Sequence, residues 1–235
     1  MGKKNFLFLF AISLFLSACN TFQTIQVLEE AYQNPVKDYN TSLTVLPLTE
    51  DYVDPELLTQ FLSKEKNEPS LISRTNKDTF YNYFGLTFSE TMTGDLQDLM
   101  QSGKPEFYSP ITFKDTTLVL NKSTMLNVLV PEKGKLYKSE QATNFSLLTQ
   151  SIMWETGFVE EQSKPLGGNN VQRVEFTLRL RYVLWDNYKE QIAGYGQINE
   201  RRNLTSLPER IFFIQLFEDI SRSIVRNSPI QERYR

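Results

Sequence analysis

The most regular pattern in the chain is an alternation of apolar and polar residues from Val174 to Leu184. Every second residue of this stretch is apolar, and Glu175, Arg179 and Arg181 lie between the apolar positions. Because neighbouring side chains of a strand point to opposite faces of a sheet, the alternation predicts a long strand with one buried face and one charged face.

Further strands are expected on both sides of this one in the sequence. Residues 185–189 form a predicted turn, and residues 191–199 are expected to return as the antiparallel partner strand. Shorter β-prone runs predict four more strands, at residues 41–48, 116–120, 125–130 and 145–154. Together these elements predict a single mixed sheet.

Amphipathic helices are expected to pack against this sheet. Asp54 followed by Pro55 is typical of a helix start, and a short helix to residue 62 follows. An apolar stripe at steps of mostly four residues predicts a longer helix that ends near residues 102–105; its members are Phe80, Phe84, Phe88, Met92, Leu96 and Leu99. A capping box at residues 206–209 is expected to start a third helix, with an apolar face of Phe213, Leu216, Phe217, Ile220 and Ile224. The expected fold class is α/β, with α+β as the alternative.

The first residues of the chain have the features of a cleavable leader. Two lysines precede the apolar run 6–16, which is too short to span a bilayer stably. The segment Leu16-Ser17-Ala18-Cys19 then resembles the lipobox of bacterial lipoproteins, in which the cysteine is acylated and becomes the first residue of the mature chain. The resemblance implies a signal peptide over residues 1–18 and lipid attachment at Cys19.

Such an anchor predicts a place in the cell envelope, because two or three acyl chains hold a domain on a bilayer permanently. Asn20 is not the aspartate that resembles an inner-membrane retention signal, so the expected location in a double-membraned bacterium is the periplasmic face of the outer membrane. A Gram-positive source would place the anchor on the outer face of the cell membrane. We expect a lipidated tether over residues 19–40, one globular domain over 41–228 and a polar tail over 229–235.

Composition restricts the chemistry that is available. The 235 residues include one cysteine and no histidine, and the formal net charge is −3. Ser-His-Asp and Cys-His nucleophilic systems are therefore excluded, as are zinc sites built from His and Cys. The acidic balance argues against nucleic-acid binding. We expect no enzymatic activity, no cofactor and no metal site.

The order of elements resembles a group of α/β envelope domains. The similarity lies in residues 43–48, 89–103 and 178–186. The group includes the TolB amino-terminal domain, the curli-secretion lipoprotein and lipoprotein activators of penicillin-binding proteins. The resemblance implies a non-catalytic protein that contacts other envelope proteins, and it leaves the oligomeric state open because members of the group differ.

Three functional hypotheses follow from these observations. The first is a non-catalytic assembly, docking or activator module, whose candidate contact residues are Glu175, Arg179, Arg181, Trp185 and Tyr188. The alternative is a binding protein for a small or lipidic ligand, such as a transport accessory lipoprotein, with a cavity between the phenylalanine-rich helix and the sheet. A third, an enzyme that uses carboxylates alone, would need paired acids across a cleft. Two acids of the densest acidic cluster, Asp54 and Glu56, are already explained by the helix start.

Overall fold

The computed structural model describes residues 21–33, 41–47, 52–62, 76–94, 96–98, 112–132, 143–161 and 171–233. The strands are β1 (Thr21–Leu28), β2 (Leu43–Pro47), β3 (Tyr52–Val53), β4 (Leu96–Asp98), β5 (Phe113–Val119), β6 (Met125–Pro131), β7 (Phe145–Glu161), β8 (Val171–Asp186) and β9 (Gln191–Leu204). The helices are the 3-10 helix η1 (Glu30–Tyr32), α2 (Pro55–Leu62), α3 (Asn76–Thr91) and α4 (Arg210–Arg226).

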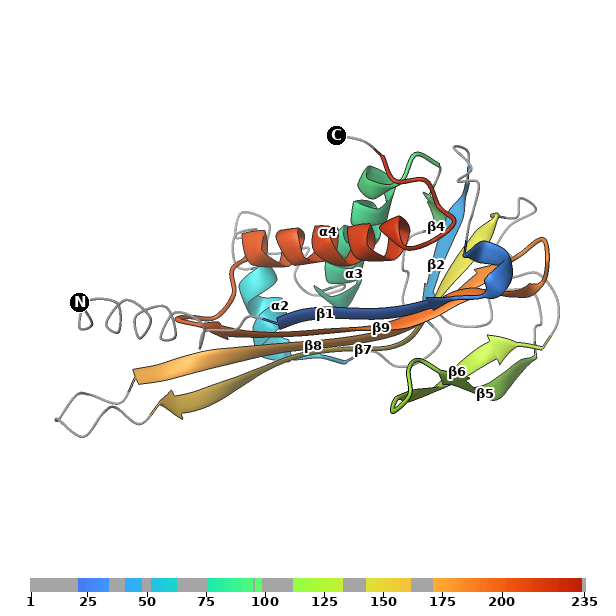
Figure 1. The fold of residues 1–235 in the computed structure, drawn as a ribbon. Helices are drawn as coiled ribbons and strands as arrows, with labels where there is room; N and C mark the ends of the chain where they lie inside the picture. The colour runs from blue at the N-terminus through green and yellow to red at the C-terminus, as the bar shows by residue number, and fades with distance from the viewer. Residues whose placement is uncertain are drawn as a thin grey trace, which may run out of the picture.

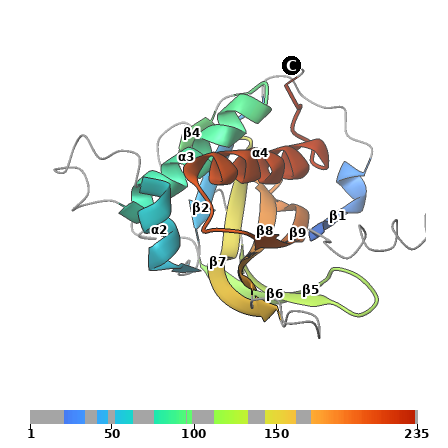
Figure 2. The same cartoon turned by 90° about the vertical axis from the view of Figure 1, so that its left-hand side faces the viewer.

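The central sheet has seven strands in the order β1-β9-β8-β7-β2-β4, with β3 paired to β7. β2 runs parallel to β4 and β7, whereas β1, β9, β8 and β7 form antiparallel pairs. The α-helices lie over one face of this mixed sheet, and the two-stranded sheet β5-β6 lies beneath the other (Figure 1, Figure 2). The predicted fold class is confirmed.

An aromatic core joins the helices to the upper face of the sheet. Every second residue of β8 from Val174 to Leu184 is buried there, as the alternation predicts. The ring of Phe80 on α3 lies 5.1 Å from Trp154 on β7 and 4.9 Å from Phe217 on α4, centroid to centroid, and both contacts are edge-on. Such pairs each add about 1 kcal/mol beyond the burial of their area, so three elements far apart in sequence are fixed by shared rings.

A bulge in β7 joins the small sheet to the large one. The register of β7 on β8 shifts between Thr149 and Ser151, and the unpaired Gln150 is turned toward β6. The Gln150 side-chain amide accepts a hydrogen bond from the Leu129 N–H at 2.7 Å and donates one to the Leu129 carbonyl at 2.9 Å. The amide thus pairs with the backbone of β6 as a neighbouring strand would.

Asp54 positions α2 at the end of β3. Its Oδ1 accepts a hydrogen bond from the backbone N–H of Glu56 at 3.0 Å, which is the expected helix-start chemistry. Its Oδ2 accepts one from the Thr156 hydroxyl at 2.7 Å, so the same carboxylate also ties the helix to β7. These contacts give Asp54 a structural role.

The predicted tether is wrong for residues 21–33. Eight residues, Thr21 to Leu28, pair with Arg201 to Gly194 of β9, and η1 follows directly. The residues of β1 are uncharged, which is compatible with an edge strand whose partner lies about 170 residues later in the chain. The described globular fold therefore begins at Thr21, and the remainder of the predicted tether falls outside the described residues.

The predicted end of the long helix is also wrong. α3 ends at Thr91, and Leu96 belongs to β4, where it is paired with Leu43 of β2. Gly94 lies so close to the Thr41 carbonyl that a Cβ at this position would stand 1.5 Å from the oxygen. The chain can therefore turn into β4 only because residue 94 has no side chain.

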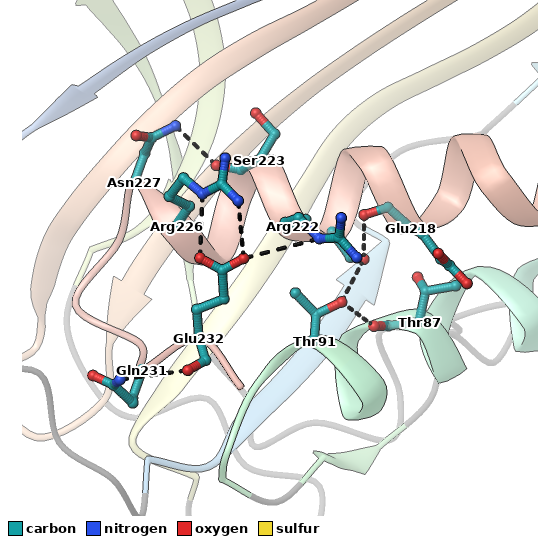
Figure 3. A network of polar contacts seen from close by, with 10 residues as sticks. Thr87, Thr91, Glu218, Arg222, Ser223, Arg226, Asn227, Gln231 and Glu232 are labelled. Carbon is teal, nitrogen blue, oxygen red and sulfur yellow. Dashed lines mark hydrogen bonds and ion pairs between the residues drawn. The ribbon is translucent and has the colours of Figure 1, made fainter. Parts of the chain in front are cut away.

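The C-terminal segment replaces the continuation of α3. Arg233 N–H donates to the Thr91 carbonyl at 2.7 Å, and Thr93 N–H donates to the Gln231 carbonyl at 3.1 Å. Figure 3 shows Glu232 held between Arg226 and Arg222 of α4; the Arg226 Nη2–Oε1 distance is 3.1 Å. Residues 229–231 are buried, so the described part of the predicted polar tail packs on the globular fold instead of extending from it.

The expected capping box before α4 does not form. The N-terminal cap is Glu209, without a side-chain capping hydrogen bond, and the helix begins at Arg210. The apolar face is confirmed, because all five of its predicted members are buried. Packing of this face, rather than Ser206, determines where the helix lies.

Candidate interaction surface

The structure separates the five candidate contact residues into two groups. Glu175, Arg179 and Arg181 lie on the lower face of β8, away from the helices. Trp185 and Tyr188 lie at the opposite end of that strand, at the turn into β9. A single patch that includes all five is therefore not present.

The first group belongs to a surface that we call the open sheet face. It consists of Glu175, Arg179 and Arg181 together with their neighbours on the lower face of β7, β8 and β9. These neighbours are Ser151, Met153, Glu155, Arg173, Thr177, Gln197, Asn199, Arg201 and Asn203. Arg179 and Arg181 are both exposed, and within the described residues neither has an ion-pair partner. Glu175 accepts hydrogen bonds from the guanidinium of Arg201. The arginines give this face an excess of positive charge.

The side chain of Trp185 is not exposed at the surface. Its side chain is 3 % exposed and packs with Leu46, Val183 and Tyr195 against the inner face of the β5-β6 sheet. The sequence places Trp185 beside a turn, where aromatic residues are often exposed. The covering hairpin comes from residues 113–131, and no local signal connects that hairpin to the turn.

Tyr188 is displayed by a strongly braced turn. Its side chain is 59 % exposed, whereas Asp186 and Asn187 just before it are buried. Asp186 Oδ1 accepts hydrogen bonds from the backbone N–H groups of Tyr188 and Lys189, both at 2.8 Å. Asn187 Nδ2 donates to the Ser146 hydroxyl at 2.8 Å and to the Thr143 carbonyl at 3.1 Å.

A second brace comes from the N-terminal part of the fold. The Tyr32 hydroxyl donates to Asp186 Oδ2 at 2.7 Å and accepts from Gln191 Nε2 at 3.0 Å. Burial and the Asp186 carboxylate raise the pKa of the Tyr32 hydroxyl well above its usual range. The Lys189 ammonium stands 4.7 Å from the centre of the Tyr32 ring. Tyr32 is not among the predicted site residues, because it lies within the segment that was expected to form a tether.

The space proposed for a ligand beside α3 holds packed aromatic side chains. Phe80, Phe84 and Phe88 are fully buried. Phe84 lies 5.5 Å from Phe88 and 5.4 Å from Phe217, centroid to centroid. These rings contact one another and act as core.

Three further features concern the leader, metal sites and membrane-spanning helices. Cys19 and the leader are not among the residues that the structure describes. In the described ranges, no cluster of three or more acidic, cysteine or histidine side chains could hold a metal ion. Among the helices that are described, none is long and apolar enough to cross a membrane.

Comparison with known proteins gives distant structural neighbours. No protein-family model and no curated protein sequence matches the chain. Two solved structures of PelC dodecamers from Paraburkholderia phytofirmans have TM-scores of 0.42 and 0.40, with 10% and 9% sequence identity. Each alignment covers 91% of this chain and 100% of the PelC chain. A likeness at this level carries no inference about function.

Proposed function

We propose that the chain is a lipid-anchored protein of the bacterial cell envelope, on the periplasmic face of the outer membrane in a double-membraned host. It acts without catalysis as a docking module for other envelope proteins. The observation that carries the proposal is the turn after β8, which presents an exposed tyrosine on a rigid support. Asp186 accepts, and Asn187 donates, more hydrogen bonds than closure of a turn requires.

A rigid exposed tyrosine is suited to protein recognition. Tyr and Trp are the residues that most often dominate binding energy at interfaces, because they bury a large area and lose little conformational entropy. Tyr188 is attached to a backbone that is already fixed, so binding would order only its side chain. Lys189, also exposed, adds a charged group beside it.

The anchor and this turn lie at opposite ends of β1. The strand begins at Thr21, two residues after Cys19, and it ends at Leu28, next to η1 and Tyr32. Eight residues of strand span about 23 Å from first to last. An acylated Cys19 would therefore lie next to the Thr21 end of β1, and the Tyr188 turn would lie about 23 Å farther along the sheet.

The test combines lipid labelling with site-specific crosslinking in native membranes. A photoreactive amino acid replaces Tyr188 in one variant and Gln215, an exposed residue of α4, in the matched control. We expect defined protein adducts from position 188 alone, and we expect them to disappear in Cys19→Ala cells. Incorporation of a palmitate analogue, lost in Cys19→Ala, checks the anchor.

Two results would contradict the proposal. Identical adduct patterns from positions 188 and 215 would show that the turn has no specific partner. Absence of the palmitate analogue from the wild-type chain would refute the anchor. Co-purification of a small molecule or lipid in place of protein adducts would favour the ligand-binding alternative.

A further inference from the structure

We infer that the open sheet face lies against an anionic lipid surface, namely the bilayer that holds Cys19. The inference rests on the proposed lipid anchor and adds the orientation in which the domain is held. It replaces the predicted tether, which would have let the domain stand away from the membrane.

Chain length limits how far this face can be from the bilayer. Only Asn20 separates Cys19 from Thr21, so the Cα atoms of Cys19 and Thr21 can be at most about 7 Å apart. Thr21 is paired with Arg201 of β9, and Arg201 is paired with Thr177 of β8. Arg201 and Thr177 both belong to the open sheet face. An acylated Cys19 therefore brings this end of the face close to lipid headgroups.

The direction of β7 and β8 favours a domain that lies along the membrane rather than upright on it. β7 continues to Glu161 and β8 begins at Val171, so both strands extend past the level of Thr21 (Figure 1). An upright domain would force this end of the two strands into the hydrocarbon core. Such insertion is costly because unpaired backbone groups at the edge of an open sheet find no hydrogen-bond partners in hydrocarbon.

Charge selects the face that turns toward the lipid. The chain carries a net charge of −3, yet Arg179 and Arg181 are exposed on this face and have no ion-pair partner within the described residues. Arg201, beside them, is 66 % exposed even though it contacts Glu175. Each arginine near an anionic bilayer favours the bound orientation about fivefold. Because the anchor already holds the domain at the surface, these few charges have to set only its orientation.

An exposed apolar pair lies on the same side of the sheet. Val119 and Met125 face each other across the end of the β5-β6 hairpin and are 55 % and 68 % exposed. Tyr195 of β9 donates a hydrogen bond to the Val119 carbonyl at 2.8 Å, which fixes the hairpin end beneath the sheet. Lys122 lies in the turn between the pair. Apolar side chains next to a lysine suit the boundary between headgroups and acyl chains.

The experiment uses the lipidated full-length chain in vesicles. Acylated Cys19 has no free thiol, so an introduced cysteine is the only labelling site. Ser151→Cys places a fluorophore on the open sheet face, and Gln215→Cys places one on α4 as the matched control. The vesicles contain phosphatidylethanolamine and phosphatidylglycerol with a headgroup-attached quencher. We expect strong quenching at position 151 and weak quenching at position 215.

Removing the arginines should weaken the contact between the open sheet face and the lipid while the protein stays attached to the vesicles. Arg179→Ala combined with Arg181→Ala should lower the ratio of bound to unbound orientation about fivefold for each arginine, while the protein still floats with the vesicles. Arg233→Ala, an exposed arginine outside this face, should leave the quenching unchanged. High salt should reproduce the effect of the double variant.

The possible failures are distinguishable. Equal quenching at positions 151 and 215, or undiminished quenching at position 151 in vesicles of neutral phosphatidylcholine, would overturn the inferred orientation. A wild-type chain that does not float with the vesicles would refute the anchor at Cys19 and, with it, both proposals.

Discussion

The Tyr32 hydroxyl donates a 2.7 Å hydrogen bond to Asp186, so the helix that follows the first strand is fixed to the turn that follows β8. The two residues are 154 positions apart in the chain. The bond joins the N-terminal edge of the sheet to the same carboxylate that organises the Tyr188 turn. The Tyr32 side chain thus adds a buried contact between η1 and this turn to the pairing of β1 with β9.

Replacement of Tyr32 by Phe should loosen this connection. A buried hydrogen bond to a charged group contributes about 2 kcal/mol, and the Asp186 carboxylate would keep only its backbone donors. We expect the free energy of unfolding to fall by about that amount in urea titrations. Amide exchange should rise in β1 more than in β7.

The control for this prediction is Tyr188→Phe, which removes a hydroxyl from the exposed tyrosine of the same turn. It should leave stability within about 0.5 kcal/mol of the wild type. If Tyr32→Phe were equally neutral, the bond to Asp186 would not brace the fold.

Gln150 offers a separate test, at the junction of the two sheets. Gln150→Ala removes both hydrogen bonds to the Leu129 backbone and leaves that N–H and carbonyl without their side-chain partner. These hydrogen bonds are part-buried and contribute about 1 kcal/mol each, so we expect a loss of about 2 kcal/mol. Exchange at the Leu129 amide should increase selectively. Asn127→Ala, an exposed change on the same strand, serves as the control, and an unchanged Leu129 exchange rate would contradict the prediction.

The sequence predicts those elements whose signal is local. The alternation in β8 is complete within eleven residues, and the buried face from Val174 to Leu184 follows from it directly. β1 lacks such a signal: its polar residues are typical of a spacer, and only pairing with the distant β9 makes it a strand. Leu96 continued the period of α3 by coincidence, because the turn at Gly94 depends on the position of Thr41.

For the candidate surface, too, the sequence predicts only the features that depend on local pattern. Arg179 and Arg181 were found because their exposure depends only on the period of their own strand. Trp185 follows the same period, but the β5-β6 hairpin covers its end of the face. Coverage by a second layer is a tertiary property, and sequence periodicity alone does not predict it.

The hydroxyl of Tyr182 is expected to destabilise the folded state. Its side chain is fully buried, and within the described residues its Oη has no hydrogen-bond partner. Burial raises the pKa of this hydroxyl far above its usual range. Tyr182→Phe removes the unsatisfied group and keeps the ring, so we expect the free energy of unfolding to increase by about 1 kcal/mol. A loss of stability of similar size would show that the hydroxyl has a partner after all.

Glu200 should make stability depend on pH. Its carboxylate is buried beneath α4, contacts Arg202, and faces Asp219 of the helix and Phe22 of β1. Burial raises the pKa of Glu200 above the ordinary value of 4.5. The nearby Asp219 carboxylate also raises this pKa, whereas the Arg202 guanidinium lowers it. The folded state therefore binds this proton more tightly than the unfolded state does. The contribution of Glu200 to stability is complete below pH 4.5 and is lost as the pH rises through the folded-state pKa.

Glu200→Gln should remove this dependence because glutamine does not ionise. Measured by urea unfolding at a series of pH values, the variant should gain stability relative to the wild type as the pH rises from 4.5 to neutrality. Glu132→Gln, at an exposed position after β6, should show no such trend. A stability difference between Glu200→Gln and the wild type that stays constant over this range would mean that burial under α4 does not shift the carboxyl. The Arg202 contact would then fully compensate its desolvation.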